Sequence, residues 1–342
     1  MAMAKVAIIG GSGYTGAELL RLLAAHPGID VAAVTGDSQA GSNVTSLYPS
    51  LAGVYGNLVY ERYTPDLVDE IDLVFCALPH GTSQSLMADL MDRVPHVVDL
   101  SADFRLHDPD AYPIWYGAAH TAPDLLSRFA YGIPEMHREE IVARGHVATP
   151  GCYPTSAILP LAPLIGAGLV EPSRIIVDAA SGVSGAGRPP KPNTTFCTVD
   201  EDFVAYGVAT HRHTPEIEQE LGASVLFTPH LAPMSRGILA SCYARPASDD
   251  ARDPARLSDA LDAAYGDEPC VVVVPEPPHT KATLGANVAH VHATYDKRTD
   301  TVIAFGAIDN LTKGASGAAV QCANLLLGMP ETIGLPLVGM TP

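Results

Sequence analysis

The stretch that decides the fold is KVAIIGGSGYTGAELLRLLAAHPGIDVAAVTGD, residues 5–37. A short apolar run meets several glycines and is followed by Leu19, Leu20 and Leu23, which recur at helical spacing. The pattern ends at His26-Pro27-Gly28, a strong helix stop, and a second apolar run begins at Val31. The stretch therefore predicts a strand, a helix and a second strand, which is how a parallel α/β sheet begins.

The glycines of this stretch suit a dinucleotide site. Gly10, Gly13 and Gly16 stand where such a site needs a tight turn, a close backbone approach to a pyrophosphate, and close packing of helix on strand. Their spacing, GxxGxxG, differs from the usual GxGxxG, so a purely structural glycine turn is the alternative. After the second strand, Asp37 could accept from a ribose 2′-hydroxyl, while Ser38 and nearby amides could hold a 2′-phosphate.

The strand and helix alternation continues through the next segments. DLVFCALPHG at 72–81 and HVVDLSADFR at 96–105 each read as a buried strand that ends in a polar loop. Such alternation predicts a doubly wound parallel sheet, whose ligands bind at the strand ends. Ser101 and Arg105 are therefore candidate contacts for an anion, and a surface salt bridge is the alternative for Arg105.

One cysteine stands at a predicted helix start, in ATPGCYPTSAILP at 148–160. Gly151 breaks the preceding strand and Pro154 suits a first helical turn, so Cys152 is expected at the helix N-terminus. The partial positive charge there favours a thiolate, the form that a nucleophilic cysteine needs. The alternative is a small buried core residue.

A thiol nucleophile also needs a base, and THRHTPEIEQEL at 210–221 offers two histidines. Thr214 is expected as the N-cap of a helix, so His213 just precedes the cap and His211 lies two residues earlier. This HxH spacing could also bind a metal, but no third ligand is near in sequence, and we expect no metal site.

Two further segments complete the pattern. The glycine-rich loop SGVSGAGRPPKPN at 181–193 could approach a flat ligand closely, and a flexible tether is the alternative. The small-residue helix expected from about Thr312 would return to the first domain.

Composition limits the classes of partner. The 342 residues carry 38 acidic and 20 basic side chains, a net charge of −18, which disfavours nucleic acid or an anionic membrane as a general partner. The apolar run after Cys152 is cut by prolines and glycines, so no membrane span is predicted, and no secretory signal is recognisable. The six cysteines are scattered without a CxxC pair, which favours a reducing cytoplasm.

The motifs together resemble a known family. GGSGYTG, LPHG, DLSADFR, YGIPE, GCYPT, SGVSGAG, HRHTPEI and DNLTKGASGAAVQ, in that order along nearly the whole chain, are similar to the N-acetyl-γ-glutamyl-phosphate reductases of arginine biosynthesis. The resemblance implies an α/β Rossmann-type NADP-binding domain over 1–150, completed by a C-terminal helix within 312–342. It also implies an α+β catalytic and dimerisation domain over 151–311, as in aspartate-semialdehyde dehydrogenase.

The resemblance also implies residue roles. Cys152 matches the nucleophile and His213 the base, while Ser101, Arg105 and His211 match substrate contacts. Many relatives carry Ser-Arg after the second strand where this chain has Asp37-Ser38-Gln39, so Ser38 is left to meet the 2′-phosphate of NADP. The implied cofactor contacts are Gly10, Ser12, Gly13, Tyr14, Thr15, Gly16, Ser38, Pro79, Ser181, Gly182, Ser184, Gly185, Asn310 and Lys313.

The implied reaction is the NADPH-dependent conversion of N-acetylglutamyl 5-phosphate to N-acetylglutamate 5-semialdehyde through a thioester on Cys152, in a cytoplasmic homodimer or homotetramer. A reductase for a longer or carrier-linked acyl phosphate, of the lysine-biosynthesis type, is an alternative, because a methylene is worth only about 1–3 kcal/mol in a pocket. A nucleotide-sensing protein without catalysis is a further alternative, which the helix-start settings of the thiol and the histidine disfavour.

Overall fold

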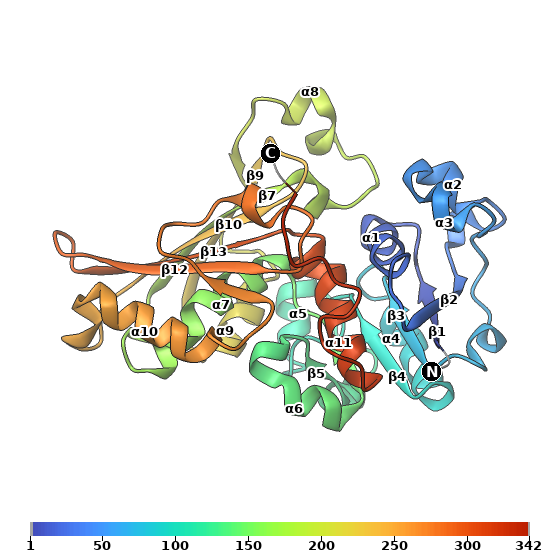
Figure 1. Cartoon of the computed structure of the whole chain (residues 1–342), viewed down its shortest axis with the longest axis horizontal. Helices are drawn as coiled ribbons and strands as arrows, with labels where there is room; N and C mark the ends of the chain where they lie inside the picture. The colour runs from blue at the N-terminus through green and yellow to red at the C-terminus, as the bar shows by residue number, and fades with distance from the viewer. Residues whose placement is uncertain (1–2, 341–342) are drawn as a thin grey trace. The chain divides into compact units, whose positions relative to one another are not determined.

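The computed structural model describes residues 3–340, which form two compact units (Figure 1). Unit 1 comprises the chain up to Pro150 together with Ala315–Leu335. Unit 2 comprises Gly151–Gly314 and the residues from Pro336 onward. Each unit has its own sheet and is described by itself.

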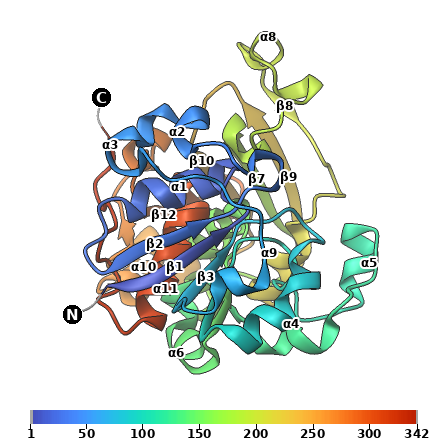
Figure 2. The ribbon, with the colours of Figure 1, turned by 90° about the vertical axis from the view of Figure 1, so that its right-hand side faces the viewer.

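Unit 1 is built on a six-stranded sheet in the order β2-β1-β3-β4-β6-β5, with parallel neighbours throughout. Figure 2 shows β2, β1 and β3 side by side. This sheet confirms the predicted doubly wound α/β fold. The strands are β1 (Ala4–Ile9), β2 (Ile29–Val34), β3 (Leu73–Cys76), β4 (His96–Asp99), β5 (Ala130–Tyr131) and β6 (His146–Ala148).

Two apolar cores cover the two faces of this sheet. Side chains alternate along a strand, so in β1 Val6 and Ile8 enter one core while Ala7 and Ile9 enter the other. The first core is shared with leucines of α1 and alanines of α11, and the second with Met87 and Leu90 of α4. The helices of unit 1 are α1 (Tyr14–Leu23), α2 (Val44–Leu47), α3 (Ala52–Tyr55), α4 (Ser83–Arg93), α5 (Ala111–Tyr116), α6 (Pro134–Arg144) and α11 (Gly317–Leu326).

The C-terminal helix α11 packs in unit 1 through small residues. Ala319, Val320 and Ala323 are fully buried, and the Ser316 hydroxyl donates to the Thr15 carbonyl at 2.8 Å. Thr312–Ser316 form a π-helical turn ahead of α11. We expected residues 312–342 to complete the first domain, but the chain after Leu335 belongs to unit 2. There the backbone N–H of Asn287 donates to the Pro336 carbonyl at 2.7 Å.

Unit 2 contains a seven-stranded mixed sheet in the order β11-β12-β13-β10-β7-β9-β8. The strands are β7 (Ile175–Gly182), β8 (Val204–Ala205), β9 (Val225–Ala232), β10 (Ile238–Ala244), β11 (Val271–Val273), β12 (Ala289–Asp296) and β13 (Thr301–Ile308). Helices α7, α9 and α10 pack against one face of the sheet, whose inward side chains are buried at every second position (Figure 1). The helices are α7 (Cys152–Gly166), α8 (Phe196–Val199), α9 (Thr214–Leu221) and α10 (Pro254–Tyr265).

Short 3₁₀ turns connect these elements: η1 (Asp37–Gln39), η2 (Pro49–Leu51), η3 (Pro65–Val68), η4 (Pro123–Arg128), η5 (Val183–Ala186), η6 (Pro192–Thr194), η7 (Asp250–Arg252) and η8 (Thr280–Thr283). Within residues 3–340, no helix is both long and apolar enough to cross a membrane.

A buried carboxylate, that of Asp99, closes β4. It accepts hydrogen bonds from the Ser101 N–H at 3.0 Å, the Ser101 hydroxyl at 2.7 Å and the Ser83 hydroxyl at 3.1 Å. Asp99 is fully buried, and burial raises the pKa of its carboxyl from 3.8 to about 6, despite the hydrogen bonds from Ser101.

This raised pKa predicts a pH dependence of stability. The folded chain binds the Asp99 proton more tightly than the unfolded chain does, so the contribution of this group is fully present below about pH 4 and is lost as the pH rises to about 6. Replacing Asp99 by Asn removes this pH-dependent contribution to stability, because an amide does not titrate. The melting temperature of wild type relative to Asp99→Asn should therefore fall between about pH 4 and pH 6 and level off above. A difference in melting temperature that is constant over this range would contradict the raised pKa.

Candidate active site

The glycine turn of unit 1 leaves room at the N-terminus of α1. Gly10 has φ +83°, and a Cβ there would lie 2.7 Å from the Ala77 carbonyl oxygen, while a Cβ at Gly16 would collide with the backbone of Gly11. Gly13 caps α1 without a side-chain hydrogen bond and faces open space to at least 4 Å. Two of the glycines thus permit close packing, and the third leaves space where a helix terminus attracts a pyrophosphate.

Other predicted cofactor contacts of unit 1 lie in loops at the C-terminal ends of the strands. Tyr14 and Thr15 form the first turn of α1, and the carbonyl of Ser12 just before it accepts from the Tyr48 hydroxyl at 2.9 Å. Ser38 is exposed in η1, directly after β2. Pro79 lies in the turn after β3. All of these positions follow the C-terminal ends of parallel strands, where doubly wound sheets bind ligands.

The predicted anion loop after β4 is buried. Ser101 is 4 % exposed and Arg105 8 % exposed, and the Arg105 guanidinium donates to the Leu100 carbonyl at 3.0 Å. Arg105 is thus buried and not on the surface, which disfavours the alternative of a surface salt bridge. A desolvated guanidinium is suited to a phosphate or a carboxylate.

In unit 2, Cys152 is the first residue of α7, as predicted. Gly151 caps the helix with extended backbone and no side-chain hydrogen bond. Cys152 is half-buried, whereas Cys76 and Cys242 are fully buried, and burial raises the pKa of both of those thiols. Cys152 thus combines partial solvent access with a helix N-terminus, the setting in which a thiolate is stabilised.

The ring of His213 lies directly against Gly151. A Cβ on Gly151 would lie 2.5 Å from His213 Nε2, so only glycine permits this approach. His213 itself occupies the N-cap position of α9, and Thr214, expected as the cap, is the first helical residue. The imidazole is therefore held at the helix junction beside the residue that precedes Cys152.

Sequence reasoning did not identify Glu216 as part of this site. It is fully buried in the first turn of α9, and its carboxylate accepts from the Gly151 N–H at 2.6 Å. The same turn therefore brings both His213 and Glu216 to Gly151. The available signal was the spacing His213-x-x-Glu216, which places both side chains on one helical turn.

His211 lies beside His213, with ring centroids 4.7 Å apart. The backbone N–H of His213 donates to His211 Nδ1 at 3.2 Å. The neutral His211 ring therefore carries its proton on Nε2. Burial, helped by the charge of Arg212, lowers the pKa of His211 to about 4. His211 is therefore neutral at neutral pH.

Two tyrosines, also not singled out from the sequence, surround His211. Its ring packs edge-on against Tyr153 and Tyr206, with centroid separations of 5.7 and 5.5 Å. The Tyr206 hydroxyl donates to the Tyr153 hydroxyl at 3.1 Å, and burial raises the pKa of Tyr206 to about 12. Burial raises the pKa of Tyr153 as well, so both tyrosines stay protonated beside the histidine.

The remaining predicted cofactor contacts, all in unit 2, lie on the segments 181–185 and 310–313, which a hydrogen bond of Asn310 connects. The Asn310 amide donates to the Ser184 hydroxyl at 2.9 Å and accepts from the Gly237 N–H at 2.8 Å. Ser181 is buried, and a Cβ on Gly185 would lie 3.1 Å from its hydroxyl oxygen. A Cβ on Gly182 would lie 2.7 Å from the backbone nitrogen of Arg236, and Lys313, in the π-helical turn, is 1 % exposed.

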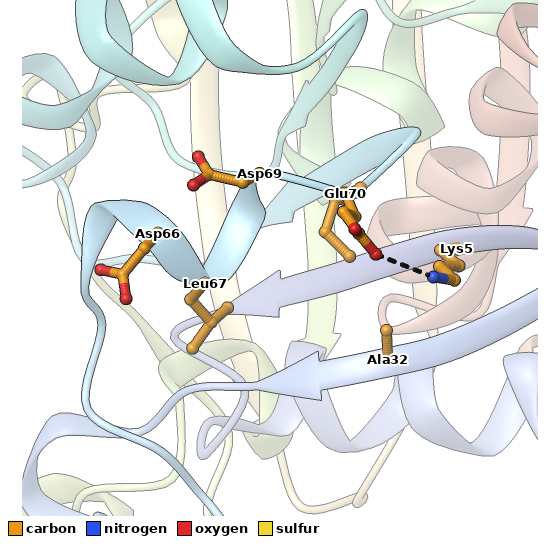
Figure 3. Close-up of a pocket in the computed structure, with 7 residues that line it drawn as sticks. Lys5, Ala32, Asp66, Leu67, Asp69 and Glu70 are labelled. Carbon is orange, nitrogen blue, oxygen red and sulfur yellow. Dashed lines mark hydrogen bonds and ion pairs between the residues drawn. The ribbon is translucent and has the colours of Figure 1, made fainter.

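A separate hollow of unit 1 contains none of the predicted site residues. It has a volume of about 420 Å³ and is lined by Lys5, Ala32, Leu67, Ile71, Asp66, Asp69 and Glu70 (Figure 3). Lys5 pairs with Glu70 at 3.4 Å. The remaining carboxylates would repel the phosphates of a dinucleotide, so this hollow does not suit the predicted cofactor.

Comparison with known proteins agrees with this geometry. Residues 5–144 match the semialdehyde dehydrogenase NAD binding domain, and residues 152–310 match the semialdehyde dehydrogenase dimerisation domain. Unit 1 therefore contains the nicotinamide-dinucleotide-binding domain that the glycine turn predicted.

Solved structures support the fold. Aspartate semialdehyde dehydrogenase II from Vibrio cholerae aligns with a TM-score of 0.73 at 17 % identity, over 96 % of this chain and 99 % of that one. Aspartate semialdehyde dehydrogenase with NADP from Candida albicans aligns with a TM-score of 0.70 at 14 % identity, over 95 % of this chain and 99 % of that one.

The sequence relatives are much closer. The N-acetyl-gamma-glutamyl-phosphate reductase of Rhodospirillum rubrum is 50 % identical over 97 % of both chains. That of Moorella thermoacetica is 47 % identical over 99 % of this chain and all of the relative. The resemblance read from the eight ordered motifs is confirmed, and the chain belongs to the N-acetyl-gamma-glutamyl-phosphate reductase family.

Proposed function

We propose that this protein reduces N-acetylglutamyl 5-phosphate to N-acetylglutamate 5-semialdehyde with NADPH, as a step of arginine biosynthesis. The observation that carries the proposal is the placement of Cys152 at the N-terminus of α7, with the His213 ring against the preceding Gly151. The names of relatives at 47–50 % identity support this choice of substrate.

Cys152 is the proposed nucleophile. Its thiolate sulfur attacks the carbonyl carbon of the acyl phosphate, inorganic phosphate leaves, and a thioester forms. The N-terminus of α7 favours the thiolate before attack, and its amides favour the developing oxyanion.

His213 is the proposed proton carrier. Its ring lies next to Gly151, close along the chain to the sulfur, so it can take the thiol proton first and give a proton to the substrate oxygen later. Glu216 accepts from the Gly151 N–H and so fixes the backbone on which both groups depend.

Bound NADPH supplies the hydride that converts the acyl group to the aldehyde level. We assign its pyrophosphate to the Gly10–Gly16 turn, with Ser12, Tyr14 and Thr15, because Gly13 leaves open space at the start of α1. Ser38 in η1 meets the 2′-phosphate. The further residues assigned to NADPH are Pro79, Ser181, Gly182, Ser184, Gly185, Asn310 and Lys313.

The substrate phosphate is assigned to Ser101 and Arg105. Both are more than nine-tenths buried, and Arg105 offers a fixed guanidinium fork. His211, neutral at neutral pH, is assigned to a substrate contact through its Nε2–H. We also propose a cytoplasmic location, in keeping with the free thiols of the six cysteines.

The open face of the unit 2 sheet is the proposed interface with a second copy of the chain. Leu226, Ile176, Tyr243 and Ile303 are register neighbours across four strands and form one row on the face opposite α7. Leu226 is 54 % and Ile176 39 % exposed. The family model gives this unit a dimerisation role, and an apolar row of this kind is typical of a subunit interface.

The first test of the reaction is direct detection of the thioester. Enzyme mixed with acyl phosphate without NADPH should gain one acyl group on the Cys152 peptide, measured by mass spectrometry. Cys152→Ala should fold and bind NADPH but lose turnover, whereas Cys197→Ala, at an exposed cysteine, should retain full activity. An adduct on another cysteine, or an active Cys152→Ala, would refute the assignment.

The second test concerns the cofactor. We expect kcat/KM with NADPH to exceed that with NADH, and Ser38→Asp to reduce the ratio by roughly tenfold or more through repulsion of the 2′-phosphate. Steady-state kinetics with both cofactors give this ratio. Equal efficiency with NADH in the wild type would instead identify Asp37 as a ribose partner.

The third test concerns the interface. A charge buried in an apolar interface is costly, so Leu226→Glu combined with Ile176→Glu should lower the molar mass measured by light scattering. Val54→Glu, which alters an exposed valine of unit 1, is the matched control and should leave the mass unchanged. An unchanged mass in the double variant would exclude this face as the interface.

A further inference from the structure

A buried carboxylate in unit 1 joins two loops that the proposed function uses separately. Asp103, in the Ser101–Arg105 loop, is fully buried. Its carboxylate accepts from the Gly81 N–H at 2.7 Å and the Gln84 N–H at 3.3 Å, and it lies 2.5 Å from His80 Nδ1. His80 and Gly81 lie in the connection between β3 and α4, and Gln84 lies in the first turn of α4. We call the segment from Pro79 to Gln84 the Pro79–Gln84 turn.

The backbone of Asp103 is fixed at the same time within its own loop. Its N–H donates to the Ser101 hydroxyl at 3.1 Å, and its carbonyl accepts from the Tyr112 hydroxyl at 2.6 Å and bonds His120 Nε2 at 2.7 Å. The Ser101 hydroxyl in turn donates to Asp99. Asp103 therefore has no freedom to move without displacing Ser101.

Asp103 is ionised in this setting. Burial opposes its charge, but the hydrogen bonds from His80 and Gly81 outweigh burial and hold the pKa of the carboxyl below its usual range. An ionised carboxylate only accepts hydrogen bonds, so it matches the N–H groups that face it. Charge-assisted bonds of this kind are stronger and more directional than neutral ones.

We propose that Asp103 is a positioning residue that holds the Pro79–Gln84 turn and the Ser101–Arg105 loop in one fixed arrangement, so that the dinucleotide and the acyl phosphate both depend on it. The proposal rests on the proposed function, which assigns Pro79 to the cofactor and Ser101 with Arg105 to the phosphate. It adds a residue that touches neither ligand in those assignments and acts through both loops.

Asp103→Asn is the decisive variant. It keeps the shape of the side chain but turns one acceptor oxygen into an N–H donor, which cannot bond the N–H groups of Gly81 and Gln84. We expect the dissociation constant for NADPH, from fluorescence titration, and the KM for inorganic phosphate, in the oxidative direction, each to rise on the order of tenfold. The kcat at saturation should change much less.

Two other variants separate this role from its alternatives. Arg105→Leu, which alters one loop only, should raise the KM for phosphate and leave NADPH binding unchanged. Asp108→Asn, an exposed aspartate of the same segment that accepts from the Asp110 N–H, is the matched control and should change neither constant.

The outcomes are decisive for this residue. A folded Asp103→Asn in which only one ligand, or neither, binds more weakly would overturn the proposal. If that variant does not fold, His80→Asn removes one partner of the carboxylate and should weaken both ligands, and normal binding of either ligand there would also overturn it. The NADPH titration needs no turnover, so a wild type that binds NADPH but does not reduce the acyl phosphate would refute the proposed reaction and not this role.

Discussion

The missing side chain at Gly151 is the constraint on which the catalytic part of unit 2 depends. Its backbone N–H is held by the buried carboxylate of Glu216, and its Cα faces the His213 ring so closely that any Cβ would displace the imidazole. Gly151 also caps α7, so the same residue sets where the helix begins and therefore where the Cys152 sulfur lies. A larger residue here would displace the His213 ring, the Glu216 carboxylate and the Cys152 thiol together.

Buried carboxylates that accept backbone N–H groups recur at several loops of this protein. Asp99 does so at the end of β4, Asp103 in the loop that follows, and Glu216 at Gly151. Asp309 accepts from the N–H groups of Gly285, Leu311 and Thr312 and also pairs with Arg236 at 2.9 Å. Burying a charge is costly unless its hydrogen bonds are satisfied, so each such residue stabilises one loop conformation strongly and tolerates few others.

Much of the fold was predictable because local pattern and tertiary structure agree. The glycine turn, the alternation of apolar runs with helical segments and the glycine before Cys152 each report a backbone requirement within a few residues. Glu216, Asp103 and Tyr206 were not predicted, because their roles depend on contacts between distant segments. Glu216 reaches Gly151 across 65 positions, and Asp103 reaches Gly81 across 22. The N-cap of α9 was predicted one residue late, at Thr214, which has the better intrinsic preference, whereas the structure has His213 there.

The two neighbouring histidines have different surroundings in the structure. His211 lies among Tyr153, Tyr206 and Phe227, and its Nδ1 already accepts from the His213 N–H. With a pKa near 4 it stays neutral at neutral pH, so it can donate a hydrogen bond from Nε2 but is poorly suited to take up a thiol proton. His213 has its Nε2 at Gly151, next to the thiol in the chain, and is the better placed of the two to carry the proton. Burial thus makes His211 a neutral hydrogen-bond donor and leaves His213 as the proposed base, a distinction that the HxH spacing alone does not reveal.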